Sequence, residues 1–254
     1  MDLGIQNTSA IISGGTKGIG LAIAQSLLSE GVNVTAFSRN NKNIKSAKKK
    51  LISYSDQIQF IQADILTEED RKNILKHHIK NFKSLDFLIN NAGQSIKTGK
   101  AENKWGLSFE SNVTSHALLT DEAIQYLEKS KVGASVVNIS SIFGRESGGS
   151  PHYNASKSAM ISFSKSYSNL LIKKGIRVNS IAPGSIRFPN GSWDKRVKSD
   201  PSGMKKFVRQ FLPAGRFGTV EEIANVVTFL ISPKASWIVG ATINVDGGQS
   251  RSNI

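Results

Sequence analysis

The segment SAIISGGTKGIG, residues 9–20, decides the fold of this chain. Its first five residues are small or apolar and predict a buried strand, while apolar residues recur at helical spacing from Gly18 to Glu30 and predict a helix. A glycine-rich turn joins the two. Its glycines let a pyrophosphate approach the backbone closely, and the N-terminus of the helix offers free N–H groups and a partial positive charge. This arrangement of strand, turn and helix therefore predicts a dinucleotide-binding turn.

On both sides of this turn, strand-like and helix-like segments alternate along the chain. Strands are expected at residues 9–13, 32–38, 58–61, 85–90, 135–140, 176–182 and 241–245. Helices are expected at residues 18–30, 43–53, 67–80, 104–129, 152–174 and 220–231. The alternation predicts one α/β domain over residues 1–254, a Rossmann-type doubly wound parallel sheet of about seven strands with helices on both faces.

One stretch does not follow the alternation. Residues Pro183 to Pro213 are rich in Gly, Pro, Ser and charge, and they are too many for a plain connection. The stretch follows the carboxyl end of a strand, where open α/β sheets bind ligands. Residues 184–213 are therefore predicted to form a substrate lid.

The composition excludes several classes of protein. The chain has 254 residues, no cysteine and a formal net charge of +14. Disulfides, thiol nucleophiles and cysteine-based metal sites are therefore excluded. The first residues show no secretory signal, and no apolar run reaches the roughly 18 residues that a membrane span needs. We expect a cytoplasmic protein with no membrane partner.

The excess positive charge has two interpretations. Lysines gather in residues 42–50 and recur at positions 173, 174, 205 and 206. They fit solvated helix faces, and they also fit attraction of an anion such as a phosphorylated cofactor, coenzyme A or an acyl-carrier protein. No motif for nucleic acid accompanies them, so no nucleic-acid partner is expected. The four histidines show no metal-ligand spacing; we expect them on the surface, with His152 adjoining the candidate site, and we predict no metal.

Tyr153 and Lys157 are the strongest candidates for chemistry. They lie four residues apart in the run YNASK, and on a helix such positions share a face. A free tyrosine has a pKa of about 10 and is a poor acid at neutral pH. A neighbouring ammonium favours the phenolate and is expected to lower the pKa of the tyrosine toward the range of efficient proton transfer.

Five short motifs together resemble those of the short-chain dehydrogenase/reductase family. Residues Ser13 to Gly20 are similar to its TGxxxGIG signature, with Ser13 in place of the usual Thr. The other four matches follow in family order, namely NNAG at residues 90–93, YxxxK at Tyr153 and Lys157, PG at residues 183–184 and DGG at residues 246–248. The resemblance covers nearly the whole chain. It implies a nicotinamide cofactor and hydride transfer between that cofactor and a carbonyl or secondary alcohol.

The resemblance also implies which residues contact the cofactor. They are Gly14, Thr16, Lys17, Gly18, Ile19, Gly20, Ser38, Arg39, Asp64, Ile65, Asn91, Ala92, Gly93, Tyr153, Lys157, Pro183, Gly184 and Ile186. The chain after the second strand carries Ser38 and Arg39 and no carboxylate. An acid there binds the ribose 2′-hydroxyl of NAD, whereas an arginine suits the 2′-phosphate of NADP. The sequence therefore predicts NADP(H).

The resemblance implies four catalytic residues: Asn112, Ser141, Tyr153 and Lys157. In the family, the serine hydrogen-bonds the carbonyl oxygen of the substrate and the tyrosine protonates that oxygen. The lysine lowers the pKa of the tyrosine and holds the nicotinamide ribose. The asparagine holds a water in a proton relay. Spacing to the following glycine selects Ser141, whereas spacing to the tyrosine favours Ser140. Phe188 departs from the family, which often has a Thr there to bond the nicotinamide carboxamide.

The substrate is open at this point. A 3-oxoacyl thioester on an acyl-carrier protein is the first candidate, because the basic charge suits an acidic partner. Small ketones, sugars or polyols handled without a carrier are the alternative, and a non-catalytic NADPH-binding regulator is the alternative of another class. Relatives are often dimers or tetramers, so a homo-oligomer is expected, a tetramer first.

Overall fold

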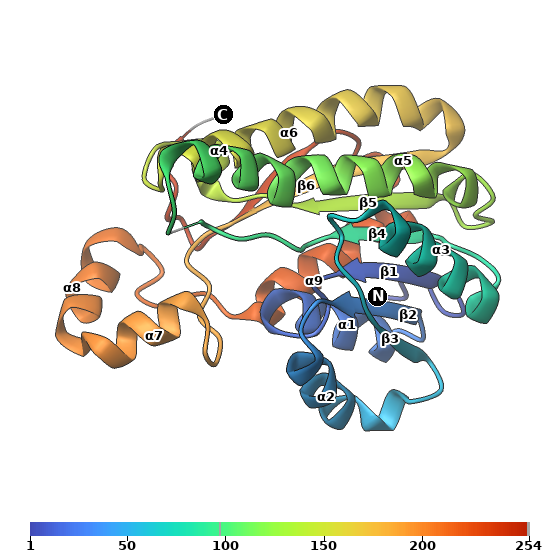
Figure 1. The fold of residues 1–254 in the computed structure, drawn as a ribbon, viewed down its shortest axis with the longest axis horizontal. Coiled ribbons are helices and arrows are strands. Elements are labelled where there is room, and N and C mark those ends of the chain that lie inside the picture. The colour runs from blue at the N-terminus through green and yellow to red at the C-terminus, as the bar shows by residue number, and fades with distance from the viewer. Residues whose placement is uncertain (97, 253–254) are drawn as a thin grey trace.

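The computed structural model describes residues 1–96 and 98–252, and within them the chain forms one parallel sheet between two layers of helices (Figure 1). The strands are β1 (Ser9–Ser13), β2 (Asn33–Ser38), β3 (Ile58–Gln62), β4 (Phe87–Asn90), β5 (Ala134–Ile139), β6 (Ile176–Pro183) and β7 (Thr242–Val245). They lie in the order β3-β2-β1-β4-β5-β6-β7, and every pair is parallel. The predicted doubly wound parallel sheet is confirmed.

Both faces of the sheet are covered by helices, which is why its central strands are buried throughout. The helices are α1 (Gly18–Ser29), α2 (Asn41–Lys50), α3 (Glu68–Phe82), α4 (Ala101–Phe109), α5 (Ser115–Leu127), α6 (Pro151–Leu171), α7 (Ser192–Ser199), α8 (Pro201–Phe211) and α9 (Val220–Ile231). Ile12 of β1 packs with the side chains of α1 and α9. Its neighbour Ile11 points the other way and packs with those of α3 and α5. Alternate residues of one strand thus build two separate cores.

The order of the strands fixes where a ligand can bind. The chain moves outward from β1 through β2 to β3, and then returns to place β4 on the other side of β1. The connections after β1 and β4 therefore leave the sheet in opposite directions and open a crevice at the carboxyl ends of these strands. The glycine turn follows β1 and the NNAG motif follows β4, so both motifs border this crevice.

Two predicted elements differ from the structure. The helix expected over residues 104–129 is divided into α4 and α5 by a π-helical turn, Glu110–Thr114. The stretch 184–213, predicted as a lid and given no helix in the sequence analysis, contains α7 and α8. The side chain of Asp200 caps α8 and Pro201 begins it, which is a helix-start signal that the high Gly, Pro and Ser content concealed.

No helix among the described residues is long and apolar enough to span a membrane.

Candidate active site

The glycine turn and the NNAG segment are joined by one hydroxyl. Ser13 Oγ, at the end of β1, accepts hydrogen bonds from the main-chain N–H groups of Asn91 and Ala92, each at 2.9 Å. The Asn91 side chain donates in return to the carbonyl oxygen of Ser13 at 2.9 Å. A hydroxyl at position 13 is therefore what the site needs, and Ser13 supplies it in place of the family's Thr.

The turn fits the backbone cradle of a dinucleotide. Gly14 has a φ of +64°, and a Cβ built on it would lie 3.1 Å from Asn91 Nδ2. A Cβ on Gly20 would collide with the carbonyl oxygen of Gly14. The α1 helix has no side-chain cap and no acid in its first turn, and the buried hydroxyl of Thr16 has no hydrogen-bond partner among the described residues. The N–H groups at the helix N-terminus therefore suit an anion such as a pyrophosphate.

A cleft of about 460 Å³ opens beside this turn. Ten of its lining residues are cofactor contacts implied by the sequence: Gly14, Lys17, Ile19, Ser38, Arg39, Asp64, Ile65, Asn91, Ala92 and Gly93. Phe188, where the sequence departs from the family, also lines the cleft. Seven others were not foreseen: Phe37, Asn40, Asn43, Ala63, Leu66, Gln94 and Ser111. Asn40 and Asn43 lie at the start of α2, just after the predicted pair at residues 38–39. Their positions in the sequence could therefore have identified them as cleft residues.

Some predicted cofactor residues do not line this cleft. Thr16, Gly18 and Gly20 shape the turn from within. Gly184 packs against Asp246, and Ile186 is buried and bridges to Gly218. Pro183 is the last residue of β6 and pairs with Val245. The structure therefore places residues 183–186 against β7 and its following loop.

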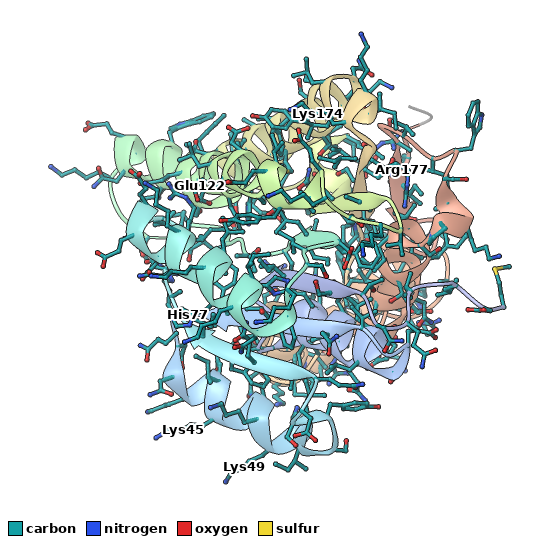
Figure 2. All side chains as sticks on the ribbon, turned by 90° about the vertical axis from the view of Figure 1, so that its right-hand side faces the viewer. Lys45, Lys49, His77, Glu122, Lys174 and Arg177 are labelled. Carbon is teal, nitrogen blue, oxygen red and sulfur yellow. The ribbon has the colours of Figure 1, made fainter. Side chains whose placement is uncertain are left out.

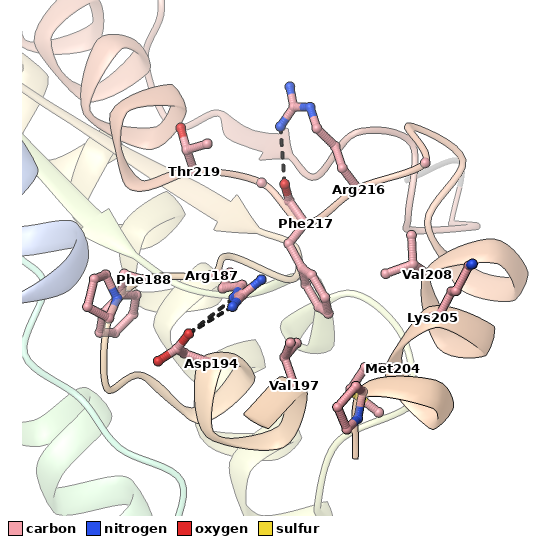
Figure 3. Close-up of a pocket in the computed structure, with 14 residues that line it drawn as sticks. Arg187, Phe188, Asp194, Val197, Met204, Lys205, Val208, Arg216, Phe217 and Thr219 are labelled. Atoms are coloured by element: carbon pink, nitrogen blue, oxygen red, sulfur yellow. Dashed lines mark hydrogen bonds and ion pairs between the residues drawn. The ribbon is translucent and has the colours of Figure 1, made fainter. Parts of the chain in front are cut away.

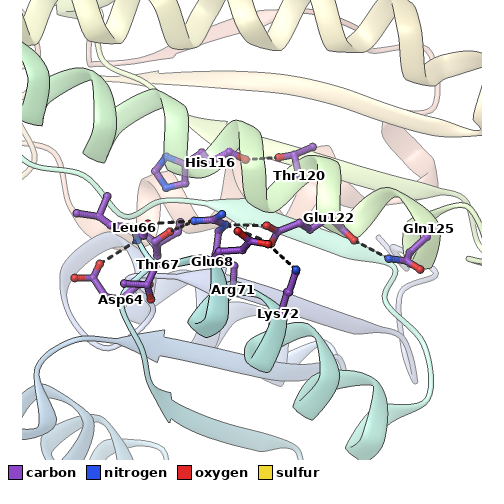
Figure 4. Close-up of polar contacts among 11 residues, drawn as sticks. Asp64, Leu66, Thr67, Glu68, Arg71, Lys72, His116, Thr120, Glu122 and Gln125 are labelled. Carbon is purple, nitrogen blue, oxygen red and sulfur yellow. Dashed lines mark hydrogen bonds and ion pairs between the residues drawn. The ribbon is translucent and has the colours of Figure 1, made fainter.

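The far end of the cleft carries the charges that bear on cofactor choice. Arg39 is 58% exposed, and its Nη1 lies 3.5 Å from Asp64 Oδ2. Asp64 begins a loop that the buried Arg71 holds, through hydrogen bonds to the carbonyl oxygens of Ile65 and Leu66 at 3.0 and 3.3 Å. Arg71 Nε also donates to Glu122 Oε1 at 3.1 Å, which joins α3 to α5 (Figure 4). The loop that walls this end is therefore fixed by a buried ion pair.

The structure brings Ser141 and not Ser140 to the candidate catalytic tyrosine. The Ser141 side chain is hydrogen-bonded to the Tyr153 hydroxyl, and its Oγ also accepts from the N–H of Phe143 at 3.2 Å. Ser140 Oγ instead donates to the carbonyl oxygen of Lys157 at 2.9 Å and ties the end of β5 to α6. The two spacing arguments in the sequence disagreed, and the geometry favours the one that selected Ser141.

Lys157 lies one helical turn below Tyr153, buried and 4% exposed. Its Nζ donates to the carbonyl oxygen of Ile139 at 2.8 Å and lies 5.9 Å from the centre of the Tyr153 ring. Burial lowers the pKa of Lys157 from 10.5 to about 8, because the ammonium loses its hydration.

The pKa of Tyr153 differs from the prediction. Burial raises it above its ordinary value, and the hydrogen bond from Ser141 acts in the opposite direction but is the smaller effect. The lowering of the Tyr153 pKa that we expected from Lys157 is therefore not found in this structure. The ammonium donates to the carbonyl oxygen of Ile139 and lies beside the Tyr153 ring, and loss of solvent around the phenol is the largest effect on its pKa.

Asn112 lies in the π-helical turn and is fully buried. Its Oδ1 accepts from the N–H of Gln94 at 2.9 Å, and its Nδ2 donates to the carbonyl of Gln94 at 3.1 Å and to Ser156 Oγ at 3.0 Å. Ser156 lies on α6 between Tyr153 and Lys157. Because π-helical turns are frequent at functional sites, the break between α4 and α5 is best explained by the placement of Asn112 against this helix.

The prediction that the histidines lie on the surface is wrong for three of the four. His78 and His116 are fully buried and His152 is 9% exposed. His116 lies behind the site, with Nε2 3.3 Å from Ser13 Oγ and Nδ1 3.4 Å from the carbonyl oxygen of Asn112. Burial lowers the pKa of both His78 and His116 to about 3. They are neutral at pH 7 and act as hydrogen-bonding core residues. Among the described residues no cluster of acids and histidines is suited to a metal.

The buried His78 predicts a loss of stability in acid. Its folded pKa of about 3 lies below its ordinary value of 6.5, so the unfolded chain binds the extra proton first as pH falls through 6.5. We expect about 2 kcal/mol of the free energy of unfolding to be lost through this ring between pH 7 and pH 5. The variant His78→Gln should show a smaller loss over that interval, measured by chemical denaturation, while His77→Gln, on the exposed face of α3, should match the parent. Equal losses in all three proteins would contradict the assignment.

The turn, the cleft and the tyrosine–lysine–serine group together define an oxidoreductase site on a Rossmann-type sheet. The family model described as Enoyl-(Acyl carrier protein) reductase matches residues 14–250. The chain therefore belongs to the short-chain dehydrogenase/reductase family of oxidoreductases.

Relatives and solved structures agree with this assignment. The 3-oxoacyl-[acyl-carrier-protein] reductase of Chlamydia muridarum is 33% identical over 249 residues, covering 96% of this chain and 98% of that protein. Dehydrogenase/reductase SDR family member 4 of Mus musculus is 32% identical over 252 residues, covering 96% of this chain and 88% of that protein. The L-sorbose reductase of Gluconobacter frateurii, solved with NADPH and L-sorbose, superposes with a TM-score of 0.91 at 29% identity, covering 99% of this chain and 100% of that one.

Proposed function

We propose that this protein is an NADP(H)-dependent carbonyl reductase with 3-oxoacyl thioesters as its first candidate substrates. The observation that carries the proposal is the convergence of Ser141, Tyr153 and Lys157 at the carboxyl edge of the sheet, next to a cleft that begins at the glycine turn. A bound nicotinamide supplies the hydride, which adds to the carbonyl carbon of the substrate.

The protein residues then act on the carbonyl oxygen. The hydroxyls of Ser141 and Tyr153 are hydrogen-bonded to each other, so an oxygen placed between them receives both donors. Negative charge develops on this oxygen as the hydride adds, and fixed donors stabilise it. Tyr153 delivers its proton to the oxygen. Lys157, still an ammonium below about pH 8, lies beside the Tyr153 ring and would hold the nicotinamide ribose. Asn112 positions α6 through Ser156 and is the candidate relay residue.

The preference for NADP(H) rests on Ser38 and Arg39, which line the cleft after β2 where the sequence has no carboxylate. The L-sorbose reductase was solved with NADPH, whereas a 7α-hydroxysteroid dehydrogenase that superposes with a TM-score of 0.88 was solved with NADH. These two structures leave the choice open, and the residues after β2 favour NADP(H) in this chain.

Replacing Arg39 tests this preference. Arg39→Ala removes the exposed guanidinium whose nearest charge is Asp64, and we expect kcat/KM for NADPH to fall roughly tenfold to a hundredfold, since hydrogen bonds to charged groups contribute about 1.5–3 kcal/mol. The kcat/KM for NADH should change little. Lys45→Ala, on the exposed face of α2 outside the cleft, is the matched control for general charge and should leave both values unchanged. A parent enzyme that prefers NADH would refute the assignment.

The proposal of a thioester substrate rests on charge and on an apolar pocket. Helices α7 and α8 and the residue that joins them, Asp200, carry six basic side chains and two acidic ones: Lys195, Arg196, Lys198, Lys205, Lys206 and Arg209 against Asp194 and Asp200. Basic side chains also cover α2, where Lys45 and Lys49 point outward (Figure 2). A phosphopantetheine arm and an acidic carrier protein would complement such a surface.

The apolar pocket lies between α7, α8 and the loop that precedes α9, and has a volume of about 660 Å³ (Figure 3). Phe188, Val197, Met204, Val208 and Phe217 form its apolar wall. The size and lining suit a short acyl chain, and they support our proposal that residues 184–213 form the substrate lid.

Oxidation of NADPH across a panel of substrates tests the proposed activity. We expect the highest kcat/KM with 3-oxoacyl thioesters, and higher with a carrier protein than with coenzyme A. Higher values for small ketones, sugars or polyols would establish the alternative, which the L-sorbose reductase likeness favours. Absence of turnover with every carbonyl, together with tight NADPH binding, would establish a non-catalytic regulator.

We further propose a homotetramer, with a dimer as the alternative, to be decided by light scattering.

A further inference from the structure

The ring of Phe188 occupies the mouth of the glycine turn. A Cβ built on Gly18, the first residue of α1, would lie 2.7 Å from Phe188 Cζ, and one on Gly191 would lie 2.9 Å from the same atom. The ring is thus packed between two glycines and touches the helix N-terminus that the pyrophosphate of a dinucleotide would use. Phe188 also lines the cofactor cleft.

Phe188 is held in this place by a tight turn fastened to α7. The N–H of Gly191 donates to the carbonyl of Phe188 at 2.9 Å, and Asn190 has a φ of +61°. The carboxylate of Asp194 accepts from the N–H of Asn190 at 3.0 Å and from Arg187 at 3.1 and 3.2 Å. The residues on both sides of Phe188 are therefore anchored to the same helix, α7.

A helix N-terminus binds a pyrophosphate more favourably than an apolar ring. The unpaired N–H groups there favour an anion, and an aromatic ring offers them no acceptor of comparable strength. Lys17 precedes α1 without a side-chain cap, and the Phe188 ring lies against Gly18 at this end of the helix. An incoming dinucleotide must displace it.

The Phe188 ring also borders a second, apolar environment. Phe188 also lines the apolar pocket beneath α7 and α8, together with Val197, Met204 and Phe217. In Figure 3 it lies at the side of this pocket opposite Met204 and Lys205. A ring that leaves Gly18 therefore finds an apolar wall adjoining its present position.

We propose that Phe188 is a latch that closes the glycine turn before the cofactor binds and is displaced toward the lid pocket when it does. This inference rests on the proposed use of a nicotinamide cofactor by this site. Phe188 thereby lowers the affinity for the cofactor, because the apolar contact with Gly18 must be broken first.

Cofactor titration of Phe188 variants tests the latch. We expect Phe188→Ala and Phe188→Thr to bind NADPH roughly tenfold more tightly than the parent, with a faster association rate, as measured by calorimetry and stopped-flow fluorescence; tenfold corresponds to about 1.4 kcal/mol. Phe211→Ala is the matched control: Phe211 lies on α8, 43% exposed and in a tilted ring contact with Phe207, and its loss should leave the affinity unchanged. Melting temperatures show whether each variant is folded. Two substitutions of Phe188 are used so that the test still stands if one variant does not fold.

The outcomes separate the latch from the proposed function. Unchanged or weaker NADPH binding in both folded Phe188 variants overturns the latch while the cofactor assignment stands. If the parent binds NADH in place of NADPH, the same comparison made with NADH decides the latch. If neither cofactor binds the parent or the variants, both the cofactor assignment and the latch are overturned.

Discussion

Tyr153→Phe is expected to lower kcat/KM for carbonyl reduction by about 10³–10⁴-fold, because it removes the proton donor from the reaction. The Tyr153 hydroxyl is hydrogen-bonded to the Ser141 side chain, and the Tyr153 ring lies beside the Lys157 ammonium. Phenylalanine keeps the ring and its packing. NADPH affinity, measured by fluorescence titration, should therefore stay at the parent value while turnover, measured by NADPH oxidation, is lost.

Tyr167→Phe is the matched control on the same helix. The Tyr167 hydroxyl donates to Asp121 Oδ1 at 2.6 Å, away from the candidate site. This variant should retain the parent kcat/KM. Turnover by Tyr153→Phe within tenfold of the parent would remove Tyr153 from the role of acid and leave Ser141 as the remaining donor.

Lys157→Met is expected to lower kcat by roughly 10²–10⁴-fold with little loss of stability. The ammonium is buried, and its folded pKa of about 8 lies below its ordinary value of 10.5. At pH 7 the unfolded lysine is charged at no desolvation cost, so burial of the charge destabilises the folded state by up to roughly 3 kcal/mol. Methionine removes that penalty, but it leaves the carbonyl of Ile139 without its donor at a cost of about 1–3 kcal/mol. The two effects nearly offset each other.

The pH dependence distinguishes these two effects. Between pH 8 and 10.5 the unfolded chain binds more protons than the folded one, so the penalty at Lys157 disappears as pH rises through that window. The parent should gain stability relative to Lys157→Met over this range in chemical denaturation. Lys165→Met, two turns further along α6 and exposed, is the control and should change neither kcat nor this dependence. A strongly destabilised Lys157→Met at pH 7 would contradict the balance.

The fold was predictable because its signals are local. A glycine turn between an apolar strand and an amphipathic helix specifies its own geometry, and the alternation of such units leaves few topologies to choose from. The motif residues at positions 14, 38, 39 and 91–93 consequently line one cleft. The tyrosine–lysine spacing placed both side chains on one face of α6, as predicted.

Features that depend on contacts between distant segments were not predictable. The choice between Ser140 and Ser141 is made by contacts between the end of β5 and α6, where Ser140 donates to the carbonyl of Lys157 and Ser141 faces Tyr153, and no spacing rule contains these contacts. His116 is polar and lies on a helix, so it was expected at the surface, yet its partner Ser13 is more than a hundred residues away. The π-helical turn has no recognisable residue pattern in the sequence, because we attribute it to the hydrogen bonds of Asn112 with Gln94 and Ser156.

The hydroxyl of Ser13 has a consequence for protein engineering. In a chimera of two relatives with the crossover between residues 20 and 85, β1 comes from one parent and β4 from the other. The two main-chain donors of Asn91 and Ala92 then depend on a hydroxyl supplied by the other parent. Parents for gene shuffling across this junction should therefore be chosen to carry Ser or Thr at that one position, whatever their overall identity.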